Sequence, residues 1–162
     1  MAPTGPLVDN RIQAVEEIIG YQFNDPAILR EALQAAGFYS VTMPSRIDGN
    51  KNLALLGDAA LKLVLVSDGY KQGAFKGIIG KVVSDTGSNE NLANVGFQKK
   101  LDQFVYTNPS QGGVVSWRVM ATTVEAILGA VFMDSAMDIH IVKQVTAVLG
   151  LSWPVNQALG SL

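Results

Sequence analysis

Cysteine is absent from this sequence of 162 residues, and histidine occurs only once, as His140. Without cysteine the chain has no disulfide, no thiol nucleophile, and no zinc or iron–sulfur cluster bound through thiolates. With one imidazole it also lacks any catalytic arrangement that needs a second histidine. These absences exclude most of the familiar hydrolase chemistries.

Charged residues are few as well, at 16%, and the net charge of −2 does not make the whole chain attractive to phosphate. No run reaches the roughly 18 apolar residues that a membrane span needs, because Asp58 and Lys62 interrupt the most apolar segment. The N-terminal sequence lacks the pattern of a secretory signal. We therefore expect an intracellular protein without membrane association, and a cytoplasmic, nuclear or mitochondrial location stays open.

Helical periodicity is the main signal in the chain, and no segment shows sustained strand alternation. We predict an all-α fold with one domain over residues 1–150 and a short C-terminal tail over 151–162. The predicted helices cover residues 12–19, 26–37, 50–70, 78–84, 89–95, 99–104, 117–133 and 139–149.

The predicted helix over 50–70 is apolar on most of its circumference, so we expect it to be buried on all sides. Two carboxylates stand within apolar segments, Asp58 in this helix and Glu125 in the helix over 117–133. Because an isolated buried carboxylate is unfavourable, each should be paired, hydrogen-bonded, bound to a metal or exposed on a narrow polar stripe. A structural contact, for instance with Arg118 or a backbone amide, is the alternative to a catalytic role.

Four sequence blocks resemble the endonuclease domain of the ribonuclease III family. NKNLALLGDAALKLVL (50–65) resembles its signature helix, and ATTVEAILGAVFMDSAMD (121–138) resembles its other active-site helix. GYQFNDPAILREAL (20–33) and SNENLANVG (88–96) are similar to its N-terminal helix pair and to the helix between the two signature helices. The resemblance implies a ribonuclease III endonuclease-domain-like helical bundle. No segment after Leu149 resembles a double-stranded-RNA-binding domain.

The resemblance also implies Mg²⁺-assisted hydrolysis of double-stranded RNA by acidic residues on two facing helices. Two of the six acidic positions of the family are acids here, so their formal charge is zero instead of −6. The residues at these positions are Lys51, Ala54, Asp58, Lys76, Thr122 and Glu125. We expect a degenerate active site that requires no cofactor, in which Asp58 and Glu125 bind Mg²⁺ weakly if at all.

Positive charge is concentrated around the signature helix. Residues 1–45 carry 2 basic and 5 acidic side chains (−3), residues 46–81 carry 6 and 3 (+3), and residues 82–162 carry 4 and 6 (−2). Within the basic stretch, Lys71, Lys76 and Lys81 are spaced five apart. We expect these lysines to contact the backbone of structured or double-stranded RNA, and a solvated lysine surface is the alternative.

Three functions are compatible with these residues. The first is a non-catalytic RNA-binding or scaffold protein in RNA processing, for which degenerate family members in the mitochondrial large ribosomal subunit are a precedent. The second is a divergent Mg²⁺-dependent endoribonuclease that uses Asp58 and Glu125, and the third is a module that heterodimerises with a complete ribonuclease III chain. The resemblance also implies a two-fold symmetric homodimer with the signature helices near the interface.

Overall fold

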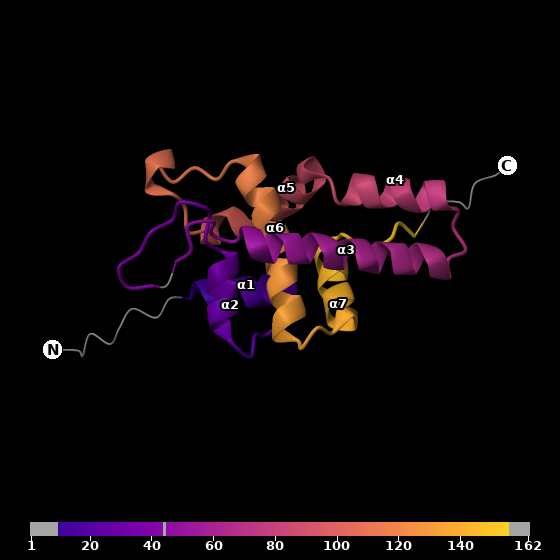
Figure 1. Cartoon of the computed structure of the whole chain (residues 1–162), viewed down its shortest axis with the longest axis horizontal. Coiled ribbons are helices and arrows are strands. Elements are labelled where there is room, and N and C mark those ends of the chain that lie inside the picture. Colours follow the sequence, from indigo (N-terminus) through magenta and orange to yellow (C-terminus); the bar gives the residue numbers. More distant parts are fainter. Residues whose placement is uncertain (1–9, 44, 156–162) are drawn as a thin grey trace.

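The computed structural model describes residues 10–43 and 45–155. Within these residues the chain forms seven α-helices and no strand, which confirms the all-α prediction (Figure 1). The helices are α1 (Arg11–Ile19), α2 (Pro26–Ala32), α3 (Lys51–Lys71), α4 (Lys76–Thr86), α5 (Asn89–Gln98), α6 (Trp117–Asp134) and α7 (Ile139–Leu149), with 3-10 turns η1 (Leu101–Phe104) and η2 (Pro109–Gln111) between α5 and α6.

Polar caps define several helix ends. The side chain of Asp138 accepts a hydrogen bond from the His140 amide at 2.9 Å, and Gly150 ends α7 in the left-handed conformation with φ 79°. The hydroxyl of Ser116 accepts from the amide of Val119 at the start of α6. These are local signals, and they explain why the predicted bounds of α7 match those in the structure.

One helix is shorter than predicted, because α2 ends at Ala32 instead of continuing to residue 37. Beyond it, the amide of Tyr106 donates to the carbonyl of Leu33 at 2.8 Å, and the amide of Ala35 donates to the carbonyl of Tyr106 at 3.0 Å. The backbone groups that would extend α2 are therefore used to hold the loop after η1. Conversely, α4 is two residues longer than predicted at each end, and α5 is three residues longer at its C-terminal end.

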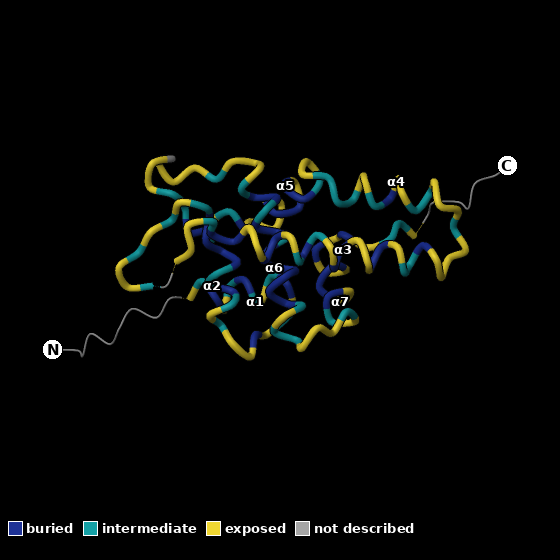
Figure 2. The backbone as a smooth tube through the Cα atoms, viewed as in Figure 1, coloured by how far each residue is buried: buried dark blue, intermediate teal, exposed yellow. Residues whose placement is uncertain are grey.

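Helix α6 forms the centre of the bundle, and α3 crosses it. Figure 1 shows α1, α2 and α7 on one side of α3, while α4 runs beside α3 on the other. Figure 2 shows that the buried residues are concentrated along α6 and the parts of α2, α3, α5 and α7 that meet it. Most residues in the last turn of α3 and in α4 are exposed or half-buried, although Val82 of α4 is buried in the core.

The expectation that the third helix is buried on all sides is wrong for the single chain. One face of α3 meets α6 and α7, but Leu55 and Tyr70 on another face are 72% and 81% exposed. We call this second face the α3 stripe. Its members, all exposed and within about 80° of arc at 100° per residue, are Leu55, Ala59, Leu63, Val66 and Tyr70.

The segment after α7 remains in contact with the bundle up to the limit of the described residues. Leu151 is buried, and Trp153 is half-buried with its ring close to Gly69 of α3. The rest of the predicted tail, residues 156–162, lies outside the described residues, as do residues 1–9 of the predicted domain. Among the helices that the structure describes, none has the length and hydropathy to cross a membrane.

Candidate functional site

The crossing of α3 and α6 brings the two carboxylates of the sequence analysis together. Asp58 of α3 and Glu125 of α6 line one open hollow of about 560 Å³. The hollow is bounded by residues of α3, α5 and α6 and the turn before α5: Lys51, Ala54, Leu55, Asp58, Gly87, Asn89, Thr122 and Glu125. Five of the six positions that correspond to family acids therefore lie at one site.

The sixth position, Lys76, lies elsewhere. It is exposed at the first residue of α4, close to the turn that connects α3 and α4, and is not among the residues that line the hollow. The structure thus separates Lys76 from the site formed by Asp58 and Glu125.

Asp58 is paired with a residue on its own helix. The ammonium nitrogen Nζ of Lys62, four residues further along α3, donates to Oδ2 of Asp58 at 2.9 Å. This hydrogen bond, together with the negative charge of Asp58, raises the pKa of Lys62. Arg118 is the cation that the sequence offers as a structural partner of these carboxylates. Its guanidinium lies 5.2 Å from the ring centroid of Trp117.

Glu125 is the more perturbed carboxylate of the two. It is partly buried, and burial raises its pKa from 4.5 to about 7, with a further upward contribution from the charge of Asp58. The positive charge of Lys62 acts in the opposite direction. Burial therefore makes the charged form of Glu125 less favourable than that of an exposed carboxyl group.

This donor set fits Mg²⁺ poorly. Hard cations such as Mg²⁺ prefer charged oxygen ligands, but one carboxylate here is paired with an ammonium group, and burial disfavours the charged form of the other. Lys51 adds a further cation to the wall of the hollow, and Ala54 contributes only a methyl group. No group of three or more His, Cys, Asp or Glu side chains that could hold a metal occurs in the described part of the chain.

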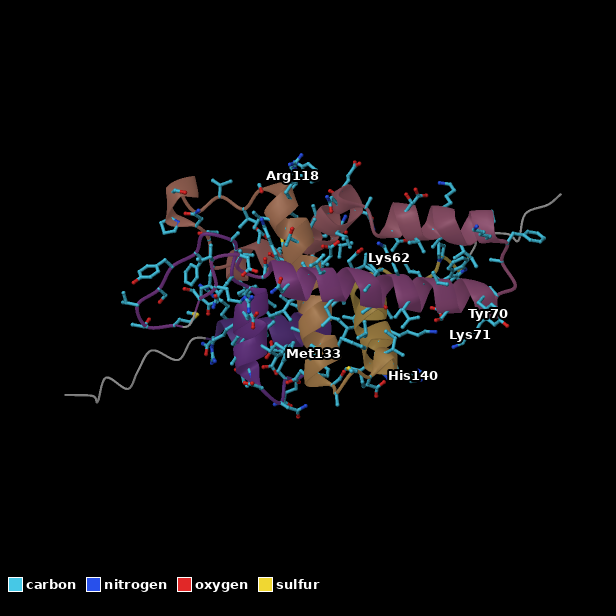
Figure 3. All side chains as sticks on the ribbon, in the orientation of Figure 1. Lys62, Tyr70, Lys71, Arg118, Met133 and His140 are labelled. Carbon is cyan, nitrogen blue, oxygen red and sulfur yellow. The ribbon has the colours of Figure 1, made fainter. Side chains whose placement is uncertain are left out.

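The three lysines predicted to contact RNA lie on the extended α3–α4 pair. Lys71 is in the last turn of α3 and Lys76 in the first turn of α4, so both flank the turn between these helices. Figure 3 shows Lys71 at the far end of α3, well along the helix from Lys62. Lys81, further along α4, forms an ion pair with Asp85.

Two residues at the site were not singled out as functional from the sequence. Lys62 is one, although its spacing of four residues from Asp58 is the signal for a helical ion pair. Asn50 is the other: its buried side-chain amide donates to the carbonyl of Ala32 at 2.8 Å and to the hydroxyl of Thr123 at 3.2 Å. Asn50 thereby connects the start of α3 to α2 and α6, close to the hollow.

The family model described as Ribonuclease-III-like matches residues 25–145, about three quarters of the chain. The protein therefore belongs to the ribonuclease III-like family.

Individual relatives agree with this assignment. The chain is 30% identical over 154 residues to Ribonuclease 3 of Vibrio atlanticus and 31% identical over 132 residues to Ribonuclease 3 of Carboxydothermus hydrogenoformans. These alignments cover 90% and 77% of this chain but only 61% and 55% of the relatives, so the chain spans little more than half of their length.

A solved structure shows the same fold. The nuclease domain of ribonuclease III from Campylobacter jejuni, described as flexible in a region involved in dimer formation, aligns with a TM-score of 0.74 and 21% sequence identity. The alignment covers 89% of this chain and 99% of that domain.

Proposed function

We propose that this protein binds structured or double-stranded RNA, in RNA processing or as a scaffold, without efficient cleavage. The observation that carries the proposal is the composition of the hollow between α3 and α6. Its two carboxylates, Asp58 and Glu125, stand beside Lys51 and Lys62, and the adjoining positions are Ala54 and Thr122. Such a site has little net negative charge to hold divalent metal, and it does not strongly repel a phosphate backbone.

The RNA contacts are assigned to Lys71, Lys76 and Lys81. All three lysines are exposed, in the last turn of α3 and on α4, and Lys81 is paired with Asp85. Contacts of this kind bind phosphates without reading sequence. No cofactor is required, and Mg²⁺ binds with low affinity at most.

The active form is proposed to be a homodimer formed through the α3 stripe. Its five members place an apolar face along a helix that carries the site, and such a contiguous exposed patch is typical of a protein interface. A two-fold symmetric contact would bring the hollows of both copies to one composite surface.

Binding and cleavage of a duplex RNA by the purified chain test the proposal. We expect salt-dependent binding with a log–log slope of about −3 for three phosphate contacts, and no Mg²⁺- or Mn²⁺-dependent cleavage. The triple change of Lys71, Lys76 and Lys81 to Glu should abolish binding at moderate salt. As a matched pair of variants, Lys71→Glu with Lys76→Glu should weaken binding much more than Lys99→Glu with Lys100→Glu, which changes the net charge equally.

Two results would contradict the proposal. Metal-dependent cleavage by the unmodified chain, lost on Glu125→Gln, would identify a divergent nuclease. Absence of RNA binding together with formation of a stable complex with a complete ribonuclease III chain would identify a heterodimerising module.

A further inference from the structure

The ammonium group of Lys62 is paired with one carboxylate of the hollow and acts electrostatically on the other. Lys62 donates to Asp58 at 2.9 Å within α3, and its charge also acts on Glu125, which reaches the hollow from α6. Two carboxylates that approach each other from facing helices repel unless a cation lies near both. In this chain, the cation is part of the protein.

We propose that the ammonium group of Lys62, paired with Asp58 at the hollow that Glu125 also lines, occupies the carboxylate a divalent metal ion would need and thereby makes the site refractory to metal binding. This inference rests on the proposed function, a site without metal-dependent cleavage, and adds the group that balances its charge. It also assigns a role to Lys62 that is separate from the RNA contacts of the α3–α4 end.

The position of the pair distinguishes it from an ordinary surface ion pair. Lys81 and Asp85 on α4 are also four residues apart, but their side chains are 64% and 60% exposed. Lys62 is 55% exposed, but Asp58 is 35% exposed, and the hollow that Asp58 lines contains a second carboxylate. A divalent ion bound to Asp58 would have to displace Lys62 or remain beside a positive charge, and Mg²⁺ gives up its water reluctantly in either case.

Mn²⁺ binding, followed by electron paramagnetic resonance on the full chain without RNA, tests the inference. The wild type should show no saturable site at micromolar Mn²⁺. Lys62→Met, which keeps the apolar stem and removes the charge, should increase the affinity for Mn²⁺ by about tenfold or more. Adding Asp58→Asn to Lys62→Met should remove that gain.

Lys143→Met is the control, since it breaks a lysine–aspartate ion pair, that of Lys143 with Asp68, away from the hollow. It should leave Mn²⁺ binding unchanged. Equal affinities in the wild type and Lys62→Met, or equal gains in Lys62→Met and Lys143→Met, would overturn the inference.

A measurement on the wild type alone covers the case in which Lys62→Met does not fold. Millimolar Mn²⁺ should not raise the melting temperature of the wild type, because a ligand stabilises only a folded state that binds it. A clear rise that is lost in Asp58→Asn would overturn the inference even if RNA binding is found. Conversely, failure to bind RNA contradicts the proposed function and leaves these metal measurements unaffected.

Discussion

Gly57 and Gly129 face each other where α3 crosses α6. A Cβ atom added to Gly57 would lie 2.8 Å from the backbone nitrogen of Gly129 and closer still to the carbonyl oxygen of Glu125. A Cβ atom added to Gly129 would lie 3.0 Å from the backbone nitrogen of Gly57 and closer to the carbonyl of Leu53. The two helices therefore touch backbone to backbone, and this contact brings Asp58 and Glu125 into one hollow.

Gly57→Ala should therefore destabilise the fold. The obstructing atoms belong to the α6 backbone and cannot rotate away, so we expect a loss of about 1–3 kcal/mol or more in the free energy of unfolding. Urea unfolding followed by circular dichroism measures the change. Gly77→Ala in α4 is the control, because a Cβ there meets nothing within 4 Å and the helix should gain up to about 1 kcal/mol. Equal stability of Gly57→Ala and wild type would show that the crossing is not tightly packed.

The fold was predictable from the sequence where its signals are local. Asp138 and Gly150 specify both ends of α7, and their residue types alone indicate a cap and a stop. The early end of α2 depends instead on hydrogen bonds with Tyr106, which is distant in sequence. No local pattern contains that information.

The exposure of the α3 stripe was missed for a similar reason. Apolar residues all round a helix predict burial on every side, but which sides are covered depends on the number of helices that pack against it. In the single chain, α6 and α7 cover one face, and α4 lies beside another. The apolar composition of α3 is therefore consistent with a second chain that covers the α3 stripe.

The sequence indicates which carboxylates meet at the hollow better than it indicates how they interact. Asp58 and Glu125 stand out as carboxylates in apolar helices, and the resemblance places them on facing helices. The pairing of Asp58 with Lys62 follows from helical spacing, but the effect of that cation on Glu125 depends on the crossing of α3 and α6. Such interhelical electrostatics cannot be derived from spacing along one helix.

Another carboxylate was missed altogether. Asp134 at the end of α6 accepts hydrogen bonds from the hydroxyl of Tyr21 at 2.7 Å, the amide of Asn24 at 2.8 Å and the amide of Asp25 at 2.9 Å. It holds the turn between α1 and α2 against α6. In the sequence, Asp134 is an ordinary polar residue at a helix end.

Glu125→Gln should alter the pH dependence of stability. The folded state of the wild type keeps a proton on Glu125 up to about pH 7, whereas the unfolded chain releases it near pH 4.5. The contribution of Glu125 to the free energy of unfolding therefore falls as the pH rises through this interval. Because the side chain is only partly buried, we expect solvent screening to limit the loss to about 1 kcal/mol.

The variant lacks this titration, so its stability relative to the wild type should increase by about 1 kcal/mol from roughly pH 4.5 to pH 8. Urea unfolding at several pH values measures the difference. Glu90→Gln, at an exposed position on α5, controls for the change in net charge. A constant difference between Glu125→Gln and wild type across the interval would mean that burial does not shift this carboxyl group.

Replacement of one residue in the α3 stripe should separate the proposed dimer. Light scattering of the wild type should give a mass near twice 17.2 kDa. Val66→Glu places a charge in the apolar contact and should yield a monomer, since an unpaired charge at an interface is strongly unfavourable.

Val148→Glu is the matched control for this experiment. Both valines are helical and 43% exposed, but Val148 lies on α7 outside the α3 stripe. Val148→Glu should keep the dimeric mass. A monomeric wild type at micromolar concentration would contradict the dimer. Equally stable dimers of both variants would show that the interface does not include the α3 stripe.

Introducing acids at two positions should create a metal site in the hollow. Ala54 and Thr122 line it together with Asp58 and Glu125, so Ala54→Glu with Thr122→Asp would place four carboxylates there. We expect calorimetry to detect Mg²⁺ or Mn²⁺ binding that the wild type lacks, because hard cations favour such a ligand set. Without metal, crowding of like charges should make the double variant less stable than wild type at neutral pH.

Added Mg²⁺ should recover that stability, since binding to the folded state alone raises the free energy of unfolding. Combining the double variant with Lys62→Met should raise metal affinity further, because the internal cation then no longer competes for Asp58. Turnover need not return, since Lys51 still places positive charge on the wall of the hollow. If the double variant folds and binds metal no better than wild type, Ala54 and Thr122 do not stand at metal-ligand positions.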